Sequence, residues 1–109
     1  MNTIKRRTII DEYIDYQEKF EEKYGENTIV LMEVGSFFEI YGVETESDNV
    51  GKVSEIATLL NIHKTRKNKK ILENSRKNPL MAGFPNHALK KFIRVLIKNH
   101  YTIVLIEQV

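Results

Sequence analysis

The sequence predicts a single α/β domain, a mixed β-sheet flanked by about three α-helices. Two β-branched apolar runs of strand length, residues 28–32 and 102–106, are typical of strands buried on both faces. Stretches with apolar residues at helical spacing lie before and between these runs. The 109 residues, 41% of them hydrophobic, suffice for one core but not for two. We therefore expect residues 1–109 to form one domain.

The first predicted element is a helix that begins at Thr8. Asp11 stands three residues later, the spacing of a capping box, and Gly25 marks a natural helix end. Its apolar stripe is Ile10, Tyr13, Ile14, Phe20 and Tyr24. The strand over 28–32 follows this helix.

A second strand is predicted after the Gly-Ser break at 35–36, over residues 37–41 and ending at Gly42. Alternate side chains of a strand share a face. Phe38 and Ile40 should therefore point into the core, and Phe37 and Glu39 together to the other face. By this spacing alone, a Phe packed under a loop and an ordinary surface charge is the commoner outcome.

The second half of the chain predicts two more helices. Ser47 or Asp48 is a candidate cap for a helix through Leu60, with one apolar face made of Val50, Val53, Ala57 and Leu60. Residues 61–78 are polar and basic and predict a long loop or hairpin, and residues 79–83 lead back to the body of the domain. Asn86 is expected to cap the third helix, whose stripe is Leu89, Phe92, Ile93, Leu96 and Ile97.

The net charge of +2 is the sum of two unlike halves. Residues 1–50 carry a charge of −7 and residues 51–109 a charge of +9, with the basic residues concentrated between positions 64 and 77. Such asymmetry favours a polyanionic partner, nucleic acid above all. A solvated basic loop is the alternative.

Several classes of function are excluded by residues that the sequence lacks. There is no Cys, so disulfides, thiolate metal sites and thiol nucleophiles are ruled out. No apolar run approaches the roughly 18 residues of a membrane span. The Gly-x-x-x-x-Gly-Lys phosphate loop is absent, and the three histidines are scattered. Glu33, Glu39 and Glu107 could meet around Mg²⁺ in a nuclease-like site, which is the less favoured alternative.

Four segments together resemble the MutS mismatch-repair family. Residues 34–41 resemble its Met-Gly-Asp-Phe-Tyr-Glu-Leu-Phe segment, and residues 59–67 its Leu-Leu-Asp-Ile…Thr-Lys-Arg segment. Residues 79–88 are similar to its Pro-Met-Ala-Gly-[Ile/Val]-Pro-Tyr-His-Ala, and residues 107–109 to the Glu-Gln-[Val/Ile] that closes its first domain. The longer basic stretch resembles the branch found in large DNA viruses and some organelles.

The resemblance implies a non-catalytic mismatch-recognition domain that binds double-stranded DNA containing mismatches or small loops. The family's wedge falls on Phe37, which would stack on the mispaired base from the minor groove, and its base acceptor on Glu39. The residues expected at the DNA backbone or minor groove are Lys64, Arg66, Lys67, Lys69, Lys70 and Met81. A general nucleic-acid-binding domain with a degenerate wedge remains the alternative.

The same resemblance implies a larger protein, of which this chain would be a fragment. Its other domains would bind ATP and Mg²⁺, and it would act as a dimer, whereas this domain would hold no cofactor or metal. We expect an intracellular location in a DNA-containing compartment and no membrane association.

Overall fold

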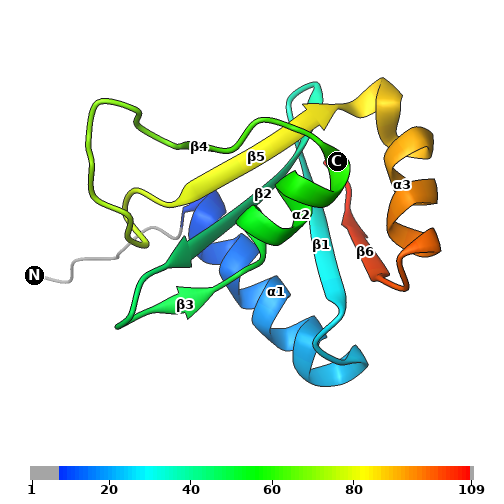
Figure 1. The fold of residues 1–109 in the computed structure, drawn as a ribbon, viewed down its shortest axis with the longest axis horizontal. Helices are drawn as coiled ribbons and strands as arrows, with labels where there is room; N and C mark the ends of the chain where they lie inside the picture. Colours follow the sequence, from blue (N-terminus) through cyan, green and yellow to red (C-terminus); the bar gives the residue numbers. More distant parts are fainter. Residues whose placement is uncertain (1–7, 109) are drawn as a thin grey trace, which may run out of the picture.

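The computed structural model describes residues 8–108, which form one mixed sheet and its covering helices (Figure 1). In chain order the elements are α1 (Ile9–Tyr24), β1 (Thr28–Val34), β2 (Phe37–Glu44), β3 (Asn49–Val50), α2 (Val53–Leu60), β4 (Thr65–Arg66), β5 (Leu80–Pro85), the 3-10 turn η1 (Asn86–Ala88), α3 (Leu89–Lys98) and β6 (Thr102–Ile106). Val109, the last residue of the closing motif, lies outside the described residues.

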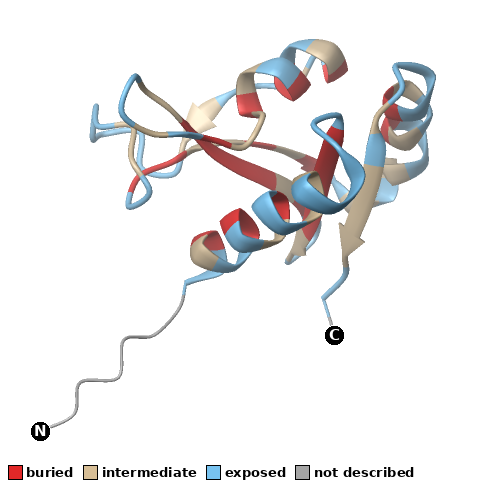
Figure 2. Ribbon diagram, turned by 90° about the horizontal axis from the view of Figure 1, so that it is seen from below, coloured by how far each residue is buried: buried red, intermediate tan, exposed pale blue. Residues whose placement is uncertain are grey.

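The sheet has the strand order β4-β5-β2-β1-β6, and β3 pairs with the end of β2. The β1–β6 pair is parallel and the other pairs are antiparallel, so the predicted mixed sheet is confirmed. Helix α1 packs on one face, whereas α2 and α3 contact each other on the opposite side (Figure 2). The fold class predicted from the sequence is therefore correct.

Helix α1 forms as its sequence predicts and is attached firmly to β1. The Thr8 side chain and the Asp11 side chain cap each other's backbone N–H at 3.1 Å, which confirms the capping box. Buried Gln17 donates to the carbonyl of Thr28 and accepts from the N–H of Val30. These bonds fix α1 over the first half of β1.

The predicted start of the second helix is wrong. Val50 belongs to β3, pairing with Val43 of β2, and α2 begins only at Val53 without a side-chain cap. Neither Ser47 nor Asp48 caps it. The reason is a close approach of two backbones: a Cβ on Gly42 would lie 2.8 Å from the Val50 carbonyl oxygen. Gly42 therefore lets β2 run on to Glu44 beside β3, where the sequence had suggested an end.

Two expectations for the C-terminal third are also corrected. Asn86 does not cap α3: it opens the 3-10 turn, and its side chain donates to Glu33 at 3.3 Å. Strand β6 was expected to be buried on both faces, but it is an edge strand with mostly half-buried residues. Residues 79–83 do return to the body: Pro79 precedes β5, and residues 80–83 are the first part of that strand.

The segment between β4 and β5 is an organised loop. The buried Asn78 side chain accepts from the N–H of Asn68 and donates toward the carbonyls of Asn68, Ile71 and Glu73. A paired Arg76 and Asp48, bonded at 2.8 and 3.0 Å, attaches the loop to the β2–β3 turn. Its own polar contacts thus replace the apolar core that its composition lacks.

Candidate nucleic-acid interface

The β2 strand begins with an exposed aromatic side chain. Phe37 directly follows the β1–β2 turn and is 44% exposed, whereas Phe38 is 3% exposed. Phe38 packs near Phe84, whose ring lies 4.5 Å from that of Phe92 on α3. The predicted alternation is confirmed: Phe38 and Ile40 enter the core, and Phe37 points to the opposite face.

Glu39 lies on the same face as Phe37 and is half-buried. Its Oε1 accepts a hydrogen bond from the phenol of Tyr41, two residues further along the strand. Burial, together with this contact to Glu39, raises the pKa of Tyr41 well above its ordinary value. Tyr41 therefore stays protonated and acts as the donor.

The strand register places further residues beside this pair. Phe37 lies opposite Val34 on β1 and Pro85 on β5, and Tyr41 lies opposite Met81. Met81 is half-buried and packs against the core on the Glu39 side of the sheet. Of the predicted contact residues, Met81 is thus the one that shares a face with Phe37 and Glu39 near the β2–β5 centre.

Gly83 occupies the position opposite Glu39, where β5 approaches β2 closely. A Cβ at Gly83 would come 2.8 Å from the Phe38 carbonyl oxygen and 3.3 Å from Cγ of Glu39. Helix α1 contacts β1 and β2, where Tyr13 meets Tyr41. Figure 1 shows the β1–β2 turn at the far end of the sheet from this helix. The Phe37 end of β2 is therefore left accessible.

The predicted basic residues do not form one continuous patch. Lys67 extends the β4–β5 ladder, because its N–H bonds to the Pro79 carbonyl. Its side chain is therefore on the same face of the sheet as those of Thr65 and Met81. Lys69 and Lys70 are exposed in the β4–β5 loop beyond it. This loop lies at the left of Figure 1. Lys64 instead donates to Ser54 on α2 at 2.8 Å.

Arg66 is used inside the protein. Its guanidinium donates to the carbonyls of Ile71 at 2.8 Å and Lys69 at 3.1 Å, closing the loop on itself. Arg66 was expected to contact the DNA backbone, and in the structure its guanidinium also orders the loop. Lys67, Lys69 and Lys70 of the same stretch are exposed to solvent.

The carboxylates of the nuclease alternative do not converge. Glu33 lies opposite Phe38 in the register, so its side chain is on the other face of the sheet from Glu39. It accepts instead from the N–H of Gln108 and the amide of Asn86. Within residues 8–108, no three His, Asp or Glu side chains gather as metal ligands. The register therefore contradicts this alternative.

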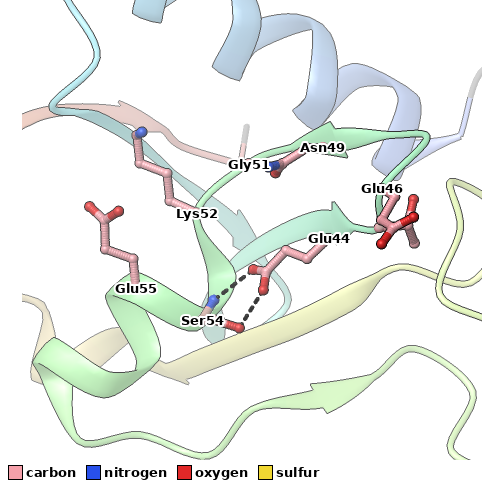
Figure 3. Close-up of a pocket in the computed structure, with 8 residues that line it drawn as sticks. Glu44, Glu46, Asn49, Gly51, Lys52, Ser54 and Glu55 are labelled. Carbon is pink, nitrogen blue, oxygen red and sulfur yellow. Dashed lines mark hydrogen bonds between the residues drawn. The ribbon is translucent and has the colours of Figure 1, made fainter.

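A surface pocket lies at the other end of β2, at the start of α2 (Figure 3). Glu44 reaches into it and accepts from the Ser54 N–H at 2.9 Å and from the Ser54 hydroxyl at 2.5 Å. The helix N-terminus, which favours anions, is thus already satisfied by a carboxylate of the chain itself. Glu44 therefore occupies the position at the start of α2 that an external anion would take.

Comparison with known families decides what this arrangement is. The model of MutS domain I matches residues 13–109, nearly the whole chain. The chain belongs to the MutS domain I family. In DNA mismatch-repair proteins of the MutS family, domain I is the recognition domain.

Full-length relatives point the same way. A putative DNA mismatch repair protein mutS homolog from Acanthamoeba polyphaga mimivirus is 30% identical over 105 residues, covering 95% of this chain and 9% of the relative. MutS proteins from Chlorobium phaeobacteroides and Thermosipho melanesiensis are 29% and 27% identical, covering 90% and 98% of the chain and 9% and 10% of those proteins. The MutS domain I chain thus spans about a tenth of the length of these relatives.

No helix within residues 8–108 combines the length and the apolar character needed to cross a membrane. Sequence reasoning placed Phe37 and Glu39 on one face and expected Met81 at the DNA, but it overlooked Tyr41 and Gly83. Strand alternation was a sufficient signal for Tyr41, because a residue two positions after Glu39 must share its face. Gly83 had no such signal, since only the β2–β5 register brings it beside Glu39.

Proposed function

We propose that this MutS domain I chain recognises mispaired or unpaired bases in double-stranded DNA, with Phe37 as the wedge and Glu39 as the base acceptor. The main support is that the two side chains share an open face of the sheet while Phe38 anchors the same strand in the core. Phe37 is also paired on both sides in the sheet, with Val34 on β1 and Pro85 on β5.

Recognition would rest on the deformability of the DNA. Apolar wedges that enter the minor groove unstack a base step and kink the duplex by about 20–90°. A mismatch has already lost part of its pairing and stacking, so the same kink costs less free energy there than in matched DNA. One rigid Phe37 can therefore serve many different mispairs.

Glu39 would add selectivity through its charge. A carboxylate close to phosphates is unfavourable on matched DNA, and it is compensated only when a displaced base offers it an N–H donor. Exposed Lys67, Lys69 and Lys70 would supply the sequence-independent, salt-dependent part of the affinity. Lys64 and Arg66 already bond within the protein, so any phosphate contact would use their remaining N–H donors.

Family membership further supports a setting in a longer mismatch-repair protein that acts as a dimer around DNA. We place the binding of ATP and Mg²⁺ in other domains of that protein, because the 109 residues contain no phosphate-loop motif. This domain then contributes recognition without catalysis, within a DNA-containing compartment.

Competition binding with the full-length protein tests the wedge. We expect Phe37→Ala to abolish the preference for a G·T or looped-base duplex over homoduplex, since a lost base–aromatic stack costs about 1–3 kcal/mol. Tyr24→Ala removes an aromatic ring of similar exposure at the end of α1 and should leave the preference intact. A preference that survives Phe37→Ala would instead favour the general nucleic-acid-binding alternative.

A further inference from the structure

We propose that Tyr41 is a positioning residue for Glu39: its phenol holds the carboxylate so that one oxygen faces the displaced base. This inference rests on the function proposed above. The structural basis is the hydrogen bond from the Tyr41 hydroxyl to Oε1 of Glu39 on the open face of β2. The bond engages one carboxylate oxygen and leaves Oε2 to accept an N–H from DNA.

The phenol of Tyr41 is itself held in place by its packing against Tyr13. Tyr41 is 4% exposed, and its ring meets that of Tyr13 edge-on, with centroids 5.5 Å apart and an interplanar angle of 76°. The Tyr13 hydroxyl donates in turn to the carbonyl of Val30 at 2.8 Å. A continuous line of contacts therefore runs from β1 through both rings to Glu39, and its last donor is fixed in direction.

Fixing the carboxylate matters because a glutamate side chain is long and flexible. Immobilising such a side chain on binding costs about 0.5–1.5 kcal/mol of conformational free energy. A carboxylate already held by Tyr41 avoids most of that cost. Because the Tyr41 hydroxyl engages Oε1, Oε2 faces the DNA as an acceptor and selects bases that present an N–H, such as the imino group of a displaced thymine or guanine.

The hydroxyl is separable from the packing role of the ring. The ring of Tyr41 packs against Tyr13, whereas its hydroxyl bonds to Glu39. Tyr41→Phe deletes only the oxygen and keeps the contact with Tyr13. The variant therefore isolates the bond to Glu39.

The experiment measures the ratio of mismatch to homoduplex affinity in the full-length protein. We expect Tyr41→Phe to lower this ratio about two- to tenfold, the range of a single lost hydrogen bond, with homoduplex binding unchanged. Because both affinities come from one preparation, any inactive fraction cancels in the ratio. Tyr101→Phe is the matched control: it deletes a hydroxyl that donates to Glu55 on α2, away from Tyr41 and Glu39, and should leave the ratio unchanged.

A second step tests whether Tyr41 acts through Glu39. In a Glu39→Ala background, Tyr41→Phe should have no further effect on the ratio, which is the non-additivity of a coupled pair. An unchanged ratio in Tyr41→Phe alone, or an equal fall in the Glu39→Ala background, would overturn the inference. If Phe37→Ala left the preference intact, the proposed function itself would fail; loss in Phe37→Ala without loss in Tyr41→Phe would reject the role of Tyr41 alone.

Discussion

At the scale of single residues, the open face depends on what is missing beside Glu39 as much as on what is present. Gly83 lies opposite Glu39, and its lack of a side chain lets β5 approach the β2 backbone. Phe37 can project because Phe38 is firmly buried. A wedge and an acceptor are thus produced by three consecutive residues and one glycine across the ladder.

Gly83→Ala tests this arrangement. The added Cβ would lie 2.8 Å from a backbone oxygen and 3.3 Å from Cγ of Glu39, so we expect a loss of about 1–3 kcal/mol in unfolding free energy and a displaced carboxylate. Two quantities should fall: the free energy of unfolding, measured with denaturant, and the ratio of mismatch to homoduplex affinity. Gly25→Ala, strained by a φ of +107° at the end of α1 but far along the chain from β2, should lower stability alone. Unchanged stability in Gly83→Ala would contradict the steric argument.

At the scale of elements, polar bonds give the loop between β4 and β5 its structure, within the stretch that the sequence predicted to be a long loop or hairpin. Arg66 closes it internally, Asn78 satisfies its carbonyls, and Arg76 fastens it to Asp48. The loop can therefore present Lys69 and Lys70 in fixed places. The basic composition of the loop indicated a polyanionic partner, whereas the contacts of Asn78, Arg66 and Arg76 determine the conformation of the loop.

The attachment of this loop should depend on pH. The hydrogen bond from Arg76 holds the pKa of Asp48 below its ordinary value of 3.8. A carboxyl whose pKa is lowered by folding stabilises the folded state above its unfolded pKa, and this contribution is lost as the pH falls through the lower, folded pKa. We therefore expect the Asp48–Arg76 pair to hold the loop at neutral pH and to release it only below pH 3.8.

Hydrogen exchange of residues 68–78 in Arg76→Gln, relative to the unsubstituted protein at each pH, measures this effect. The ratio of exchange rates should exceed one at neutral pH and approach one in acid, once Asp48 is protonated in both. Lys77→Gln, which removes an exposed charge next to Arg76, should give a ratio near one throughout. A ratio for Arg76→Gln that does not change with pH would show that Asp48 is not the group responsible.

At the scale of the whole molecule, the small net charge is the sum of an acidic and a basic half that contribute different parts of the domain. The acidic N-terminal half supplies α1 and the strand with Phe37 and Glu39, and the basic half supplies the loop and its lysines. The two come together because β5 pairs with β2, which brings Lys67 into the same sheet as Glu39. The distribution of charge over the domain, and not its net charge, would therefore decide how the domain interacts with DNA.

Lys67→Gln combined with Lys69→Gln should weaken binding to mismatch and homoduplex about equally. Each lost phosphate contact should also reduce the slope of log K against log salt concentration by about 0.9. Lys98→Gln, at the end of α3 on another side of the sheet, is the matched control and should change neither (Figure 1). Titrations at several salt concentrations measure both quantities, and a loss confined to mismatched DNA would contradict the phosphate role.

The sequence by itself determined the fold class, the first helix with its capping box, and the alternation that separates Phe37 and Glu39 from Phe38. These features follow from local periodicity and capping, which neighbouring residues decide. The start of α2, the turn at Asn86 and the exposure of β6 required the tertiary structure. Contacts between distant segments decide them: β3 adds to β2, Glu33 takes the Asn86 amide, and β6 occupies an edge. The partner of Glu39 belongs to both levels, because alternation put Tyr41 on its face and the packing of Tyr13 fixed its ring.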